Sequence, residues 1–134
     1  MRALIQRTFR SKLFVDGQLI SEIPSGLTIF LGIQKGDTEE QADYLARKIA
    51  KLRVFRDDND KMNLDITQAG GEILLVSQFS LAGTLGKGTG NRPDFGHAEL
   101  PDRARELYVR VTEKIRQQGI VVKNGVFGAH MYIE

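Results

Sequence analysis

Hydroxyl and amide side chains gather at the end of one apolar segment, residues 72–81, which reads Glu-Ile-Leu-Leu-Val-Ser-Gln-Phe-Ser-Leu. Alternate side chains of a pleated strand share a face, and here both faces begin apolar and become polar from Ser77 to Ser80. A strand buried on both sides would deliver these groups to the rim of a hydrophobic core, where ligand sites form. The alternative is that Ser77 and Ser80 only end the strand by bonding nearby backbone.

Nucleophilic and metal-assisted chemistry find little support elsewhere in the chain. A serine nucleophile needs a base, usually a histidine, but His97 and His130 lie in no diagnostic motif and Gly-x-Ser-x-Gly is absent. Two scattered histidines without cysteine make no recognisable zinc site. We therefore expect no metal and no cofactor. We expect main-chain N–H groups at the strand end to stabilise the oxyanion of an attacked ester.

Strands at both ends of the chain and two helices between them are expected to position this segment. Residues 3–15, 18–23 and 27–33 predict a three-stranded meander, with Asp16-Gly17 as its hairpin turn. Shorter strands are predicted at residues 54–55, 120–122 and 126–133, and a turn at the acidic run 57–60.

The helices are predicted from apolar residues at three- and four-residue spacing. The first begins at Thr38, which with Gln41 fits a capping box. The second has Pro101 in its first turn and stops at Gly119. The glycine-rich stretch before it lacks the spacing of a nucleotide P-loop, and we expect a mobile loop that carries Lys87 and Arg92 towards a ligand.

Composition indicates one domain that needs no disulfide bonds for its stability. The chain has 134 residues, no cysteine and a formal net charge of +2, too balanced to indicate nucleic-acid binding by itself. Local basic clusters at residues 2–12 and 47–56 either contact phosphate or form solvated faces. No apolar run approaches the ~20 residues of a membrane span, and the start reads as a strand rather than a signal peptide. We expect a cytoplasmic protein with no membrane partner.

A second segment, Asn124–Met131, places two glycines around Phe127 and so permits close backbone approach to a ligand. Together with Ser77–Leu81 it resembles the D-aminoacyl-tRNA deacylase (D-tyrosyl-tRNA deacylase) family, whose signatures read Ser-Gln-Phe-Thr-Leu and Gly-x-Phe-Gly-Ala-x-Met. The resemblance covers nearly the whole chain in the right order. It extends to four further motifs: Ala3-Leu4-Ile5-Gln6-Arg7, Lys61-Met62-Asn63-Leu64, Ala69-Gly70-Gly71 and Asn91-Arg92-Pro93-Asp94-Phe95.

This resemblance implies an α+β fold: a compact β-barrel-like domain with two main helices packed outside, which works as a homodimer with active sites at the subunit interface. It implies an enzyme that hydrolyses the ester of D-aminoacyl-tRNA, or of glycine mischarged on alanine tRNA, in chiral proofreading. The site residues that it implies are Ser77, Gln78, Phe79 and Ser80 as catalytic, and Arg7, Phe127, Gly128, Ala129 and Met131 as substrate-binding.

The chain departs from the family pattern at two places. Ser80 stands where the family usually has threonine, so the hydroxyl is kept and the methyl is lost. The family's Gly-Pro motif, in Asn-Asp-Gly-Pro-Val-Thr, would follow shortly after Glu134, and in the family it reaches into the partner's pocket and excludes L-amino acids. The single domain 1–134 is therefore expected to end just before this motif. Either the sequence continues beyond Glu134, which we expect, or this is a variant without the filter.

Two other functions remain open on sequence grounds. One is a non-catalytic module that binds the tRNA end on the same scaffold. The other is a small-metabolite binding protein that shares only the scaffold. Hydrolysis of D-aminoacyl-tRNA separates the first from an enzyme, and salt-sensitive affinity for tRNA argues against the second.

Overall fold

Strand β7 (Glu72–Ser77) lies inside a four-stranded mixed sheet and leads to the candidate site. The sheet order is β1-β4-β7-β8; β1 (Arg2–Thr8) runs antiparallel to β4 (Gly26–Gly32), while β4, β7 and β8 (Val122–Asn124) are parallel. The structure is a computed structural model that describes residues 1–86, 88 and 90–134.

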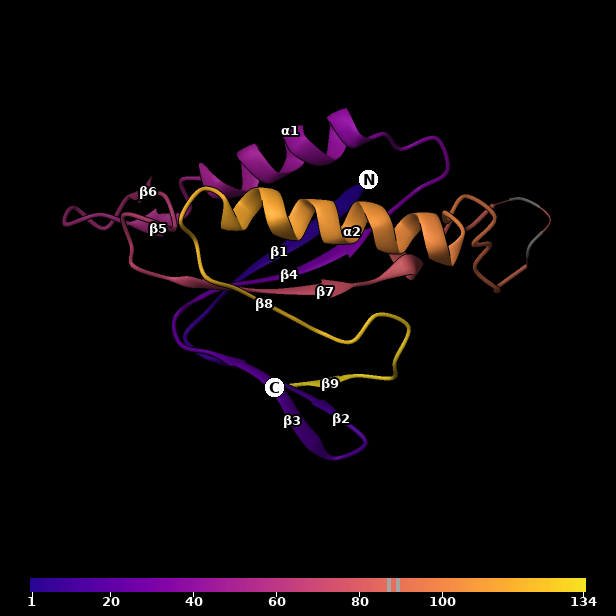
Figure 1. Ribbon diagram of the computed structural model, residues 1–134, viewed down its shortest axis with the longest axis horizontal. Helices are drawn as coiled ribbons and strands as arrows, with labels where there is room; N and C mark the ends of the chain where they lie inside the picture. Colours follow the sequence, from indigo (N-terminus) through magenta and orange to yellow (C-terminus); the bar gives the residue numbers. More distant parts are fainter. Residues whose placement is uncertain (87, 89) are drawn as a thin grey trace.

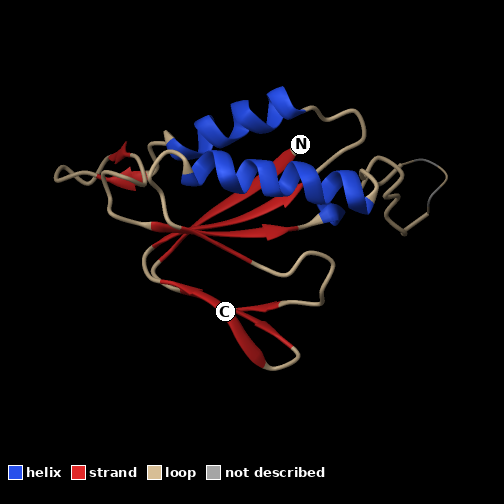
Figure 2. Cartoon of the chain, in the orientation of Figure 1, coloured by secondary structure: helices blue, strands red, loops and turns tan. Residues whose placement is uncertain are grey.

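The remaining strands form two smaller sheets. An antiparallel sheet of order β3-β2-β9 contains β2 (Ser11–Val15), β3 (Gln18–Ile23) and β9 (Tyr132–Ile133). A separate two-stranded ribbon contains β5 (Phe55–Arg56) and β6 (Met62–Leu64). Helices α1 (Glu39–Ala50) and α2 (Pro101–Arg116) cover one side of the four-stranded sheet, and the β3-β2-β9 sheet lies on the other (Figures 1 and 2).

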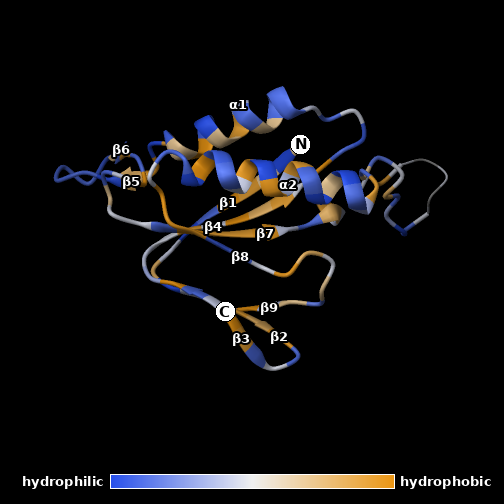
Figure 3. Ribbon diagram, in the orientation of Figure 1, coloured by the Kyte–Doolittle hydropathy of each residue, from blue (hydrophilic) through white to orange (hydrophobic). Residues whose placement is uncertain are grey.

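The two faces of β7 contribute to two hydrophobic cores. Ile73 and Leu75 belong to the larger core, beneath the helices, and Leu74 and Val76 pack with residues of the second sheet such as Leu13. All four β7 side chains are at most 1% exposed, and burying such a side chain contributes roughly 1.5–3 kcal/mol. Figure 3 shows apolar residues concentrated along β4 and β7. The prediction of a strand buried on both sides is confirmed.

The helix boundaries agree with the sequence signals. Thr38 Oγ1 accepts a hydrogen bond from the Gln41 N–H, and the Gln41 side chain accepts one from the Thr38 N–H, so the predicted capping box is present. Pro101 occupies the first turn of α2. The helix is followed by Gly119, whose φ of 81° is the left-handed conformation that glycine adopts most easily.

One ion pair joins the outer faces of the two helices. Arg110 Nε donates to Asp43 Oδ1 at 2.7 Å, and Arg110 Nη2 donates to Asp43 Oδ2 at 2.9 Å. This two-pronged contact is the main reason why the pKa of Asp43 is lowered from its ordinary value of 3.8.

Two expectations about the sheets are wrong. The expected barrel is an open set of mixed sheets with no closed barrel among the described residues, because β1 and β8 remain edges of the four-stranded sheet. The expected meander is also absent, since residues 3–15 break between Thr8 and Ser11 and β1 pairs with β4 while β2 pairs with β3. The chain leaves one sheet and enters the other at this break, where Phe9 is 96% exposed.

Two strand predictions are too long. The segment 72–81 leaves the sheet after Ser77, and Phe79–Ala82 form a short 3₁₀ helix, η1. The segment 126–133 forms a strand only at Tyr132–Ile133. The acidic turn is confirmed: Asp57 Oδ1 accepts main-chain hydrogen bonds from Asn59 at 2.9 Å and Lys61 at 3.1 Å. None of the helices in the described part of the chain is long and apolar enough to cross a membrane.

Candidate active site

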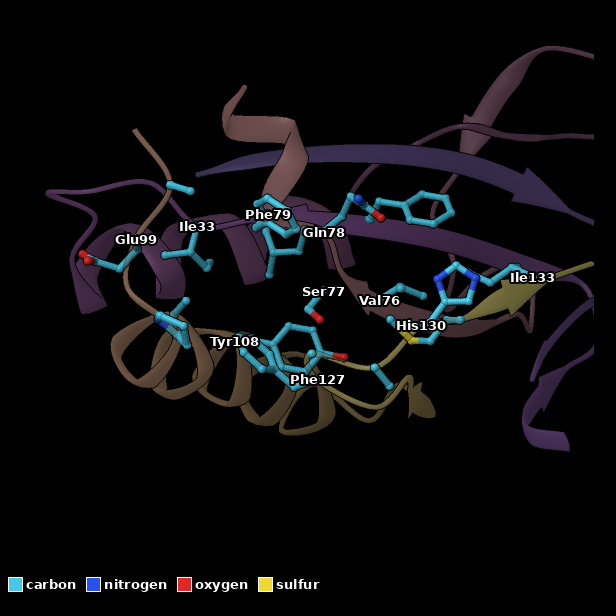
Figure 4. Close-up of a pocket in the computed structure, with 18 residues that line it drawn as sticks. Ile33, Val76, Ser77, Gln78, Phe79, Glu99, Tyr108, Phe127, His130 and Ile133 are labelled. Carbon is cyan, nitrogen blue, oxygen red and sulfur yellow. The ribbon is translucent and has the colours of Figure 1, made fainter. Parts of the chain in front are cut away.

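A pocket of about 810 Å³ opens where β7 ends (Figure 4). One wall is the turn from β7 into η1, the opposite wall is the segment that leaves β8, and the start of α2 lies between them. The lining is mostly apolar, with a few polar groups from Ser77, Gln78, Glu99, Tyr108 and His130. Apolar pockets with a few convergent polar groups are typical of small-molecule sites.

The structure brings most of the predicted site residues together in this pocket. Ser80 and Arg7 do not line it; the others do, namely Ser77, Gln78, Phe79, Phe127, Gly128, Ala129 and Met131. The two groups are separated by some fifty residues of sequence, and the fold joins them because β7 and β8 are parallel neighbours whose carboxyl ends point to the same edge.

The turn after β7 leaves main-chain donors unpaired beside the pocket. The Gln78 N–H donates to the Leu31 carbonyl oxygen at 2.9 Å, and the Leu81 N–H donates to Gln78 O at 3.3 Å. Among the described residues, no acceptor is found for the N–H groups of Phe79 and Ser80, which begin η1 and have no partner within it. Two successive N–H groups of the turn, one of them from the lining residue Phe79, thus lack acceptors in the described part of the chain.

The side chains of this turn differ in their hydrogen bonding. The Gln78 Nε2 donates to Ser80 Oγ, so the Ser80 hydroxyl is engaged within the turn rather than in the pocket. Ser77 lies between Phe79 and the pair Tyr108 and Phe127 in Figure 4. Its hydroxyl has no partner in the part of the chain that the structure describes, so it is free to bond a ligand.

The opposite wall is a stack of aromatic and cationic groups. The Tyr108 and Phe127 ring centroids are 5.9 Å apart, and the Arg105 guanidinium lies 4.9 Å from the Phe127 centroid. Tyr108 OH donates to the Leu75 carbonyl oxygen at 2.6 Å. Burial raises the pKa of Tyr108, which a hydrogen bond from Asn124 partly offsets, so the phenol stays neutral at physiological pH.

Arg7 lies away from the pocket within one chain. It pairs with Leu27 near the start of β4, whereas the pocket forms at Leu31 near its end. Its Nη1 donates to the Val54 carbonyl oxygen at 2.7 Å. Arg7, expected to bind substrate, therefore does not line the pocket of its own chain.

The basic cluster at residues 47–56 does not line the pocket, whereas Arg2 of the cluster at residues 2–12 donates to the Leu81 carbonyl oxygen of η1 at 2.9 Å. The cluster at residues 47–56 lies at the end of α1 near β5, opposite the end of α2 that meets η1 (Figure 1). Several of its members are paired locally: Arg56 with Asp60 at 2.6 Å and Lys51 with Asp65 at 3.7 Å. Of the predicted ligand-binding loop, Arg92 is exposed and does not line the pocket, and Lys87 lies outside the described residues.

Among the lining residues that sequence reasoning did not assign to the site are three with polar side chains: Glu99, Tyr108 and His130. Tyr108 lies among the apolar residues of the second predicted helix, and a tyrosine on a buried helical stripe is itself a signal, because its hydroxyl needs a partner. His130 could have been noticed from its place beside Met131. Within the described ranges, no group of three or more histidine, aspartate or glutamate side chains is arranged to hold a metal.

Comparison with known proteins decides the family. The family model described as D-Tyr-tRNA(Tyr) deacylase matches residues 4–134. The chain belongs to the D-Tyr-tRNA(Tyr) deacylase family. Among its relatives are proteins named D-aminoacyl-tRNA deacylase from Persephonella marina, 52% identical over 99% of this chain and 88% of that protein, and from Aquifex aeolicus, 47% identical over 98% and 87%.

Solved structures share the fold of this chain. A structure named c-Myc DNA Unwinding Element Binding Protein is 36% identical, covers 100% of this chain and 90% of that one, and superposes with a TM-score of 0.90. A structure described as a probable eukaryotic D-amino acid tRNA deacylase shares the fold, with a TM-score of 0.80 at 16% identity over 98% of this chain and 91% of that one. The resemblance inferred from the sequence motifs is confirmed.

Proposed function

We propose that this chain hydrolyses the ester between a D-amino acid and the terminal adenosine of tRNA, and also glycine mischarged on alanine tRNA. Its membership of the deacylase family supports this activity. The observation that carries the proposal is the pair of unpaired N–H groups at Phe79 and Ser80, next to the pocket that Ser77 and Phe127 line. The products are free D-amino acid and tRNA, which makes the reaction a proofreading step in translation.

In the proposed mechanism, water attacks the acyl carbon and the carbonyl oxygen becomes an oxyanion. The N–H groups of Phe79 and Ser80 donate to that oxygen, and one such donor typically accounts for on the order of 10²-fold or more in rate. The bond from the acyl carbon to the ribose oxygen then breaks, and that oxygen takes up a proton. The neighbouring ribose hydroxyl of the substrate relays the proton from the attacking water, because the turn itself offers no strong base.

The two walls of the pocket have separate roles in this proposal. Ser77, Gln78 and Phe79 lie beside the ester, and Ser80 offers its main-chain N–H while its hydroxyl, bonded to Gln78, fixes the turn. Phe127 offers an aromatic ring for the adenosine, and stacking on such rings is a common way to hold unpaired bases. Gly128, Ala129 and Met131 complete that side of the pocket.

We further propose that the chain acts as a homodimer in the cytoplasm, where charged tRNA is used. Strand β1 is an edge of the four-stranded sheet, and apolar side chains near this edge are solvent-exposed, with Leu4 57% and Phe9 96% exposed. Unpaired edges and exposed apolar groups favour pairing with a second copy. Light scattering across a dilution series tests this, and a persistent 15.0 kDa species that cleaves substrate would exclude a site that needs two subunits.

Chiral selection is proposed to depend on the family's Gly-Pro motif, beyond Glu134. The main chains of Glu134 and Lys12 exchange two hydrogen bonds of 2.9 Å, so any continuation leaves the sheet from a fixed position. A form extended through Asn-Asp-Gly-Pro-Val-Thr should reject L-aminoacyl-tRNA more strongly than the 134-residue chain, because steric exclusion discriminates strongly. Equal rejection by folded forms of both lengths would place selectivity in the pocket walls alone.

The experiment that tests the proposed activity compares D-tyrosyl-tRNA and L-tyrosyl-tRNA as substrates. A non-catalytic module that binds the tRNA end would retain labelled tRNA but release no amino acid. This alternative is the weaker one, because relatives with 43–52% identity are named as deacylases. Release of free D-tyrosine at a rate proportional to enzyme concentration distinguishes the two.

A further inference from the structure

One side chain, Asn124, links the end of β8 to three residues of α2. Asn124 Nδ2 donates to Tyr108 OH at 2.9 Å and to Thr112 Oγ1 at 3.0 Å, and its Oδ1 accepts from Arg116 Nη2 at 2.9 Å. The three helix residues are spaced four apart and therefore share one face of α2. Both donors and one acceptor position of the carboxamide are thus used by the helix.

The main chain at the same place is held from other directions. Ser21 Oγ donates to the Asn124 carbonyl oxygen at 2.6 Å. The Gly125 N–H donates to Leu75 O at 3.1 Å, and the same oxygen accepts from Tyr108 OH at 2.6 Å. The β7–β8 pairing ends here, at Leu75 opposite Asn124. These bonds fix the point and direction in which the chain leaves the sheet.

Beyond this point the chain becomes the second wall of the pocket. Between β8 and β9 this segment has no strand partner among the described residues. Its position therefore depends on where, and in which direction, the chain leaves β8. Gly125 passes so close to its neighbours that an added Cβ would lie 2.6 Å from Met131 Sδ and 3.0 Å from Leu13 Cδ1. Two residues later the Phe127 ring packs against Tyr108, whose hydroxyl Asn124 holds.

We propose that Asn124 is a positioning residue for deacylation: through Tyr108 and Thr112 it holds the wall from Phe127 to Met131 where the terminal adenosine binds. This inference rests on the proposed function. Asn124 does not line the pocket, so it acts through the wall and not by contact with substrate. The competing possibility is that these hydrogen bonds only stabilise the packing of α2 on β8.

Two substitutions separate these roles. Asn124→Ala removes all three side-chain hydrogen bonds. Thr112→Val keeps the side chain's shape but removes the acceptor for Asn124 Nδ2 and the hydroxyl's own bond to the Tyr108 carbonyl oxygen. Thr112→Ser restores the hydroxyl. Thr112 is 3% exposed and does not line the pocket. Asn59→Ala, in the exposed Asp57–Lys61 turn, is the matched control for the change from asparagine to alanine.

The measurements are kcat and KM with D-tyrosyl-tRNA, melting temperature, and calorimetric binding of a 3′-amide analogue of D-tyrosyl-adenosine that cannot be hydrolysed. For Asn124→Ala we expect KM and the analogue's Kd to rise about tenfold with kcat changed less than about threefold, because ground-state binding is what the wall supplies. Thr112→Val should raise both values about threefold, and Thr112→Ser and Asn59→Ala should match the parent protein.

The outcomes are distinct. A lower melting temperature for Asn124→Ala with unchanged KM and Kd would show a purely structural role and overturn the inference. If Asn124→Ala fails to fold, Thr112→Val distinguishes the two roles instead. An unchanged Kd of the analogue for folded Thr112→Val would overturn the inference in the same way. If the parent protein itself neither binds the analogue nor cleaves D-tyrosyl-tRNA, the proposed function fails and this inference fails with it.

Discussion

The Gln78 main-chain N–H donates a 2.9 Å hydrogen bond to the Leu31 carbonyl oxygen, one residue after β7 ends at Ser77. This bond extends the contact between β4 and the chain that follows β7 just to the point where the backbone turns into η1. The next two N–H groups, at Phe79 and Ser80, then lack acceptors within the described residues. The proposed oxyanion contacts therefore follow from where this strand pairing stops.

The main-chain N–H of Ser80 should contribute more to kcat than its hydroxyl does. Ser80→Ala removes only the hydrogen bond from Gln78 and should lower kcat at most about tenfold, whereas Ser80→Pro removes the N–H and should lower it at least about 100-fold. Single-turnover rates with D-tyrosyl-tRNA and circular dichroism of both variants check this. Complete loss of turnover in a folded Ser80→Ala variant that still binds substrate would replace the backbone mechanism with a required hydroxyl.

Neither histidine should act as an essential base. His130 lines the pocket, so His130→Ala is the demanding case, and His97→Ala is its control away from the lining. Each variant should keep most of kcat, and a chelator should change little, because the proposed proton relay is a ribose hydroxyl of the substrate. A loss of about 10³-fold in folded His130→Ala would identify it as a general base.

The close approach of β4 to η1 should make Gly32 intolerant of a side chain. An added Cβ would lie 2.8 Å from Leu81 Cβ and 2.9 Å from Gln78 O, so Gly32→Ala must displace the turn that carries the unpaired N–H groups. We expect a loss of about 1–3 kcal/mol in stability and a larger proportional loss of kcat than of substrate affinity.

Gly86→Ala is the control for stability, because an added Cβ there meets none of the described atoms within 4 Å. Denaturant unfolding and steady-state kinetics of both variants give the comparison. An unchanged kcat in Gly32→Ala would mean that the position of η1 does not govern the chemistry.

The Asp43–Arg110 contact should stabilise the fold in a pH-dependent way. The pKa of Asp43 is lowered in the folded protein, so its contribution is present above the unfolded value of about 3.8 and is lost as pH falls through the lower folded value. The melting temperature of Asp43→Asn should therefore lie below that of the parent at pH 7, and the difference should shrink below about pH 4. A difference independent of pH would assign the effect to packing.

Features that depend on residues close in sequence were predicted correctly, whereas features that depend on contacts between distant residues were not. The capping box at Thr38 and Gln41 and the doubly buried strand before Ser77 depend on neighbours in sequence, and both are confirmed. The end of that strand depends on Leu31, some forty-five residues earlier, so the conversion of Phe79–Ala82 to a 3₁₀ helix was missed.

The candidate site shows the same difference between local and long-range features. The motifs indicated both walls of the pocket, from Ser77 to Phe79 and from Phe127 to Met131. The contacts that fix the second wall, from Asn124 to Tyr108, join residues sixteen apart that carry no joint signature. Likewise, the exposed break at Phe9 that divides the strands between two sheets lies in a segment whose alternation looked like a single strand.

The most direct test of the central claim is the single-turnover rate of D-tyrosyl-tRNA hydrolysis by the purified protein, measured beside Ser80→Pro. The parent protein is expected to release D-tyrosine at a rate proportional to its concentration and without added metal, and folded Ser80→Pro should retain at most about one hundredth of that rate. Equal rates for the two proteins, or binding of the tRNA without release of D-tyrosine by the parent, would contradict the account.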